Sequence, residues 1–266
     1  MHTRHLLALA AVVVAPAAGA HEFWISPDTY RPAAGGLVRV SLFHGERFAG
    51  EVVPRDEERI KRFQMLMEAG AVPVRGLHGG LESFVRPDAA GNAIMVYEGL
   101  ERFNNLPGER FEAYLAEEGL DAIAQWRAEN GQTGEAGREA YVRCSKSLLQ
   151  VGSDASEAAV VPFDREVGLD CEIILEGCEA GDDGTALTVR VLFEGAPLEG
   201  ARVVGVAAAT HEELIEVYTD DEGRAMLTAT HGGAWMVTTL HMTRTQGRED
   251  ADWKSYWASV TFEIGG

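Results

Sequence analysis

The segment LTVRVLF at residues 187–193 decides the fold class, because its apolar and polar side chains alternate with the period of two of a half-buried β-strand. The same alternation recurs in LVRVSLF at 37–43 and in YWASVTFEI at 256–264. After about residue 165, short segments of this kind follow one another, separated by turns such as the Asp-Asp-Glu-Gly run at 220–223. The pattern is typical of a β-sandwich and predicts a mainly β protein.

One stretch departs from this pattern and favours helices. Residues 107–118 (PGERFEAYLAEE) place a proline at the first helical position, and residues 120–129 (LDAIAQWRAE) end at an Asn-Gly pair. We therefore expect an N-terminal β-sandwich-like domain over 21–165 with a helical insertion near 105–131. The Gly-Asp-Asp-Gly run at 181–184 is interpreted as a linker, so a second β-sandwich domain is expected over 183–266.

Composition excludes several functions. The 266-residue chain has 42 acidic and 23 basic residues and a formal net charge of −19, which disfavours binding to nucleic-acid phosphates. The catalytic signatures GxSxG, HExxH, GxGxxG and the P-loop are absent, so we expect a binding protein and no enzyme. The three cysteines allow limited disulfide pairing. Cys171 and Cys178 flank a predicted strand that would keep them apart, whereas Cys144 could pair with either of them.

The first twenty residues, MHTRHLLALAAVVVAPAAGA, have the features of a secretory signal peptide. Arg4 gives a positive start, an apolar run of ten residues follows from Leu6, and the small residues Ala18 and Ala20 frame a cleavage site. The run is too short for a permanent membrane span. We therefore expect cleavage after Ala20 and a periplasmic or secreted mature protein that does not itself cross the membrane.

Cleavage at this point would leave His21 as the first residue of the mature chain. Its α-amino nitrogen and ring Nδ1 could then chelate one metal ion together, and a second histidine would complete a three-nitrogen set. Such sets suit Cu(II), Ni(II) or Co(II). A tripeptide-type site would need histidine at mature position three, where Phe23 stands. The alternative is that the cleavage site merely happens to precede a histidine.

Two further histidines are candidate ligands. His44 follows a predicted strand and precedes Gly45, which places it at the mouth of a loop. His241 lies near the end of a strand, on the face opposite Met236, and is either a third ligand or a histidine packed within the sheet. The remaining mature-chain histidines lie in loop-like segments and are weaker candidates for metal binding: His78, which is expected to be solvated, His211 and His231.

Several segments together resemble the exported DUF4198 family, whose best-described members are related to periplasmic components of nickel and cobalt uptake systems. They include AHEFWISP at 20–27, VRVSLFHGERFAGEVVPRD at 38–56, RFEAYLAEEGLDAIAQWRAENG at 110–131, TDDEGRAMLTATHGGAWMVTTLHM at 219–242 and DWKSYWASVTFEI at 252–264. The resemblance implies a transthyretin-like or immunoglobulin-like sandwich for the C-terminal domain. It also implies metal binding by His21, His44 and His241.

These observations predict a periplasmic binding protein for a divalent transition metal ion. Nickel or cobalt follows from the family resemblance, and copper is a further candidate because nitrogen ligands bind Cu(II) most tightly. The expected partners are the metal ion and a membrane metal transporter that receives it. The alternative is a β-sandwich module without metal that serves adhesion or contacts carbohydrate or protein.

Overall fold

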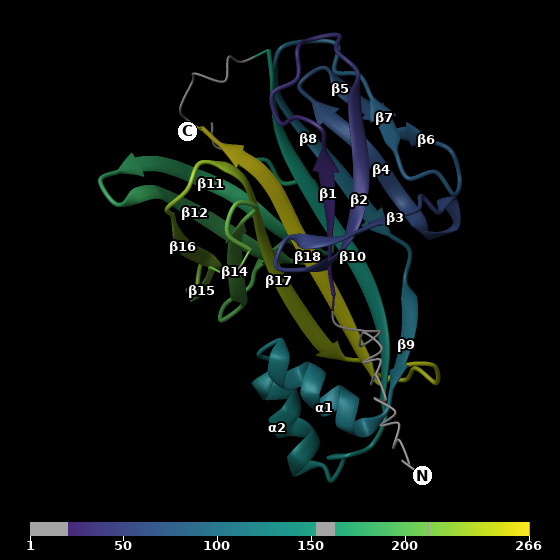
Figure 1. Ribbon diagram of the computed structural model, residues 1–266. Coiled ribbons are helices and arrows are strands. Elements are labelled where there is room, and N and C mark those ends of the chain that lie inside the picture. The colour runs from purple at the N-terminus through teal and green to yellow at the C-terminus, as the bar shows by residue number, and fades with distance from the viewer. Residues whose placement is uncertain (1–20, 153–162, 212, 266) are drawn as a thin grey trace, which may run out of the picture.

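A nine-stranded sheet runs through the middle of the protein in the computed structural model (Figure 1). The structure describes residues 21–152, 163–211 and 213–265, so the predicted signal peptide at 1–20 lies outside the described residues. A second sheet packs on one face of the central sheet and a third on the other, which gives three β layers. The prediction of a mainly β, sandwich-like fold is confirmed.

The central sheet combines strands from both halves of the chain. Eight strands follow one another across it, in the order β15 (Leu214–Tyr218), β14 (Arg202–Ala207), β17 (Gly233–Arg244), β18 (Trp253–Ile264), β10 (Gly137–Val151), β8 (Gly91–Gly99), β4 (Ile60–Met67) and β5 (Gly70–Pro73). The ninth, β9 (Arg102–Leu106), pairs with β10. Strands β10 and β18 are parallel, with Glu139 opposite Trp253 and Ser147 opposite Thr261, whereas the other pairs are antiparallel.

The two covering sheets come from different parts of the sequence. The first contains β1 (Glu22–Pro27), β2 (Val38–Glu46), β3 (Ala49–Val53), β6 (Arg75–Gly76) and β7 (Ser83–Val85). The second contains β11 (Cys171–Gly181), β12 (Gly184–Phe193), β13 (Ala196–Pro197) and β16 (Arg224–Ala229). Because side chains alternate along a strand, β10 buries Val142 and Cys144 against the second sheet's core and Leu149 and Val151 against the first sheet's core.

Two short helices close one end of the central sheet (Figure 1). They are α1 (Gly108–Glu117) and α2 (Asp121–Glu129), so the predicted helical insertion is confirmed; a single 3-10 turn, Glu57–Arg59, lies elsewhere. Phe111 and Tyr114 of α1 pack against Trp253 and Trp257 of β18. Only glycine fits at Gly137, because a Cβ there would lie 2.2 Å from the Phe111 ring. The insertion is therefore docked on the sheet.

The interpretation of residues 181–184 as a linker was wrong. Gly181 and Gly184 face each other across the tight turn of the β11–β12 hairpin, so this run connects two strands of one sheet. Gly and Asp are the usual residues of both tight turns and linkers, and local sequence does not separate the two. The strands of the two expected domains, 21–165 and 183–266, also share the central sheet through the β10–β18 pair.

Candidate functional site

The structure brings two of the three predicted metal ligands together at the start of β1. Strands β1 and β2 pair antiparallel with Phe23 opposite His44, which places residue 21 beside the end of β2. The imidazole rings of His21 and His44 are perpendicular, and their centroids lie 4.7 Å apart. A third polar group completes the cluster, because the Oε1 atom of Glu46 lies 3.1 Å from Nδ1 of His21. Glu46 was not among the predicted ligands.

The Nδ1 atom of His21 is a buried nitrogen without a hydrogen-bond partner among the described residues. The side chain is 16% exposed, and the nearby Glu46 oxygen lacks hydrogen-bond geometry toward it. Two imidazoles and one carboxylate are donors that suit a late first-row divalent ion. Their ligand atoms are not all within 4.8 Å of one another, since in the described part of the chain only an acidic turn meets that criterion. These side chains alone therefore do not form a closed three-ligand site.

The central sheet holds the start of β1 in place. The partly buried guanidinium of Arg143 donates a 2.7 Å hydrogen bond from Nη1 to the carbonyl oxygen of His21 and stacks 4.6 Å from the centroid of the Trp257 ring. The hydroxyls of Ser145 and Ser259 donate to the carbonyl oxygen of Phe23, at 3.1 and 2.7 Å. The backbone of residues 21–23 is thereby fixed to β10 and β18.

The electrostatics of this region keep His44 neutral. Partial burial, the positive charge of Arg143 and the neighbouring His21 ring together lower the pKa of His44 to about 4. A histidine with this pKa carries no proton charge near neutral pH, so one ring nitrogen has a free lone pair. That is the form in which imidazole binds metal ions.

His241 does not join this cluster, so its prediction as a ligand alongside His21 is corrected. Along β17 the side chains alternate, and Met236 packs with Trp24 of β1 while Val237 faces the core on the opposite side. His241 has the same parity as Val237, and its ring packs against Phe193 of β12 at 4.5 Å between centroids. The central sheet therefore separates His241 from His21. Burial lowers the pKa of His241, in keeping with a histidine packed in the sheet.

The three weaker candidates, His78, His211 and His231, lie in exposed turns. His78 is near Asp56 and accepts a hydrogen bond from the backbone N–H of Glu57 at 3.4 Å. Nδ1 of His211 lies 3.1 Å from the carbonyl oxygen of Arg47, and His231 contacts the hydroxyl of Thr230. None of the three shares a metal-compatible cluster among the residues that the structure describes.

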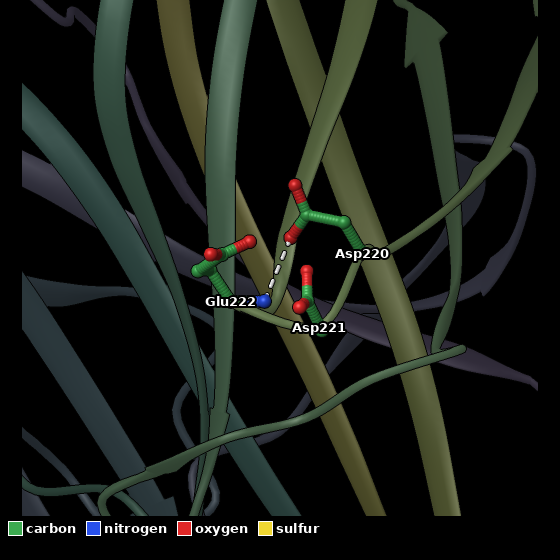
Figure 2. Close-up of side chains that lie close together, drawn as sticks. All are labelled: Asp220, Asp221 and Glu222. Carbon is green, nitrogen blue, oxygen red and sulfur yellow. Dashed lines mark hydrogen bonds between the residues drawn. The ribbon is translucent and has the colours of Figure 1, made fainter.

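Three carboxylates lie close together in the turn between β15 and β16 (Figure 2), and they are the group in the described part of the chain whose ligand atoms all lie within 4.8 Å of one another. The group consists of Asp220, Asp221 and Glu222, all exposed. Oδ1 of Asp220 accepts hydrogen bonds from the backbone N–H groups of Glu222 at 3.1 Å and Arg224 at 2.7 Å. This is the side-chain-to-backbone bonding that stabilises Asx-type turns, so the turn itself accounts for Asp220.

A cavity of about 400 Å³ lies next to the histidine pair, and sequence reasoning missed it. Its walls come from the start of β1, the end of β2 and the C-terminal end of α1, and its floor from β14, β17 and β18. Four glutamates line it: Glu22, Glu46, Glu117 and Glu118. Burial raises the pKa of Glu118 to about 7 and also raises the pKa of Glu22. No local motif signals the cavity, because its residues are spread over most of the sequence.

Within the described residues, neither helix is long and apolar enough to cross a membrane.

Comparison with solved structures finds distant likenesses. The D0-D1 domain of intimin is 14% identical, with a TM-score of 0.23, over 91% of this chain and 97% of that one. A tetra-tandem repeat from the extending region of a large adhesion protein is 10% identical, with a TM-score of 0.21, over 91% of this chain and 49% of the other. TM-scores this low carry no argument about function.

No curated protein sequence matches the chain significantly. One family model does match, described as a domain of unknown function (DUF4198), and it spans residues 18–243. The match covers most of the chain and includes both histidines of the cluster. Of the strands and helices that line the cavity, only β18 lies wholly outside the match. The protein belongs to the DUF4198 family.

Proposed function

We propose that this protein is an exported carrier of a divalent transition metal ion, held at the processed N-terminus by His21, His44 and Glu46. One observation carries the proposal: two imidazoles lie 4.7 Å apart, with a carboxylate oxygen 3.1 Å from the ring of the first residue of the expected mature chain. The ion is cargo, so no catalytic residues are assigned.

The α-amino group of His21 supplies the donor that the side chains lack. After cleavage at Ala20 it would chelate the ion together with Nδ1, which has no hydrogen bond to lose. His44 is neutral and adds a second imidazole, while Glu46 adds a negative charge that offsets part of the ion's charge. Arg143 and the two serines restrict the backbone of residues 21–23, which lowers the entropy lost on binding.

Two separate arguments suggest which metal ion the site would bind. Nickel and cobalt are suggested by resemblance to uptake components, and Cu(II) by its higher place in the affinity order for nitrogen ligands. Protons compete for the same nitrogens, since an α-amino group titrates near ~8 and an unperturbed imidazole near ~6.5. Affinity should therefore fall below about pH 6. Delivery of the ion to a membrane transporter completes the proposed role.

The test uses protein exported with its natural N-terminus and titrated calorimetrically with Ni(II), Co(II) and Cu(II). The variants His21→Ala and His44→Ala should lose tight binding, whereas His78→Ala is the control, because that imidazole lies in an exposed turn. One residue added before His21 removes the chelating amine while retaining every side chain. Equal affinity of the extended and natural proteins would show that the amino group is not a ligand.

A second candidate function rests on another part of the molecule. Leu77 is 80% exposed and Leu81 is 55% exposed, and both line an apolar groove with Phe84 beside β6, the edge strand of its sheet. Exposed apolar side chains beside an edge strand favour contact with another protein. An adhesive or protein-contacting module is therefore the alternative. Exported protein that contains and binds no transition metal would favour it.

A further inference from the structure

The cavity beside the histidine pair has the lining of a binding site for a small organic molecule. Its volume of about 400 Å³ lies within the usual range for ligand pockets. The floor carries apolar side chains, Val204 and Leu240, together with Trp257. Three elements contribute carboxylates to the lining: Glu22 comes from β1, Glu46 from β2 and Glu118 from the end of α1.

The charges around the cavity favour a cation, because four glutamates line it against two arginines, Arg47 and Arg202. Arg202 is already paired with Glu216, at 2.7 Å. Glu117 and Glu118 stand at the C-terminal end of α1, where the helix dipole is negative, and the last turn of α1 has no basic residue. The Glu118 side chain has no hydrogen bond or ion pair within the described part of the chain. Burial raises its pKa to about 7; the charge of Arg202 opposes this rise, whereas the charges of Glu22 and Glu117 add to it. A positive group beside Glu118 would relieve this repulsion.

The spacing of the carboxylates separates an organic cation from a bare metal ion. The cavity glutamates do not form a group of three with ligand oxygens within 4.8 Å of one another, as direct coordination would require. They are instead distributed around a space that also has apolar and aromatic walls. An ammonium or guanidinium group on a short carbon chain matches both features, since its N–H groups can reach separate carboxylates while the chain covers the floor.

We propose that this cavity binds a small organic cation, a primary amine or guanidinium carried on a short apolar chain, with Glu22 and Glu118 as the main anionic partners. The cavity adjoins the proposed metal site and shares Glu46 with it, but neither His21 nor His44 lines the cavity. The main anionic partners, Glu22 and Glu118, are not among the proposed metal ligands, so the proposal does not depend on metal binding.

The experiment uses mature, metal-free protein and cadaverine as the probe, in buffer with 150 mM salt so that the general negative field is screened to about 8 Å. Glutarate, a dianion of the same chain length, and Mg²⁺, a compact dication, are the comparison ligands. We expect saturable binding of cadaverine and none of glutarate. Mg²⁺ at the same concentration should not displace the bound cadaverine.

Glu118→Gln and Glu22→Gln should each weaken cadaverine binding by about tenfold or more, because each removes a charge-assisted hydrogen bond. Glu199→Gln is the matched control: it removes the same charge from an exposed turn outside the cavity and should leave the affinity unchanged. Absence of saturable cadaverine binding, equal weakening by Glu199→Gln, or displacement by Mg²⁺ would each overturn the proposal. His44→Ala tests independence, since loss of metal binding should not affect cadaverine.

Discussion

Replacing Glu118 with glutamine should stabilise the protein at alkaline pH. Burial is the main cause that raises the pKa of Glu118 from 4.5 to about 7; Arg202 and Arg143 oppose the rise, whereas Glu22 and Glu117 add to it. The folded protein therefore binds a proton at Glu118 between about pH 4.5 and 7 that the unfolded chain releases. Stability consequently decreases as pH rises through this window and stays reduced above it.

The size of the effect follows from the shift. One pKa unit corresponds to about 1.4 kcal/mol, so the full change amounts to about 3 kcal/mol. Glu118 is only partly buried, and solvent in the cavity screens its charge, so we expect Glu118→Gln to unfold with a free energy about 1–2 kcal/mol higher than the wild type at pH 8.

Urea unfolding at pH 5 and pH 8 measures this difference. The advantage of Glu118→Gln should be large at pH 8 and nearly absent at pH 5, where the folded wild type already carries the proton. Glu199→Gln, in an exposed turn, should show no such dependence. An equal gain in the free energy of unfolding at both pH values would contradict the prediction, as would a Glu118→Gln protein that is less stable than the wild type at pH 8. A variant that gains stability while losing cadaverine affinity would show that this charge is retained at a cost to the fold.

Three further predictions concern the core. Lys146→Ala should lower the free energy of unfolding by about 3–5 kcal/mol, because it leaves the buried Glu172 carboxylate, 2.9 Å from Nζ in the native protein, without its cation; denaturant titration would contradict this if the loss were below about 1 kcal/mol. Gly137→Ala should destabilise by at least about 1–3 kcal/mol, since the new Cβ would overlap the Phe111 ring, and an unchanged melting temperature would refute the close contact. Burial raises the pKa of Cys144 to about 12, so this thiol should react with an alkylating reagent at pH 8 only as the protein unfolds; rapid labelling of the native protein, read by mass spectrometry, would disagree.

Local sequence patterns predicted strands and helices well where apolar residues recur with the period of that secondary structure. Residues 187–193 and 256–264 lie in β12 and β18, and the helices fall inside the expected stretch at 105–131. Residues 181–184 were misassigned, because the Gly and Asp residues of a hairpin turn have the composition of a linker. Whether such a run is a turn or a linker depends on whether the flanking strands pair with each other, and that pairing is a property of the whole fold.

The residues of the candidate site were also predicted only in part. His21 was identified from the cleavage motif, and the expected solvation of His78 from its glycine-flanked loop, since both are local signals. The alternation along β17 also showed that His241 and Met236 lie on opposite faces, but it did not show which face would meet β1. A side-chain period defines two faces of a strand and carries no information about their partners.

The sequence by itself therefore determined the alternating strands, the helical insertion and the histidines that are candidate metal ligands, because each depends on neighbours within a few positions. Only the tertiary structure decided that β10 pairs in parallel with β18, that Glu46 stands beside His21, and that Glu22 and Glu118 share a cavity. These contacts join segments tens to hundreds of residues apart. They form because burying both faces of the central sheet selects one arrangement of the covering strands, and that selection depends on the whole chain at once.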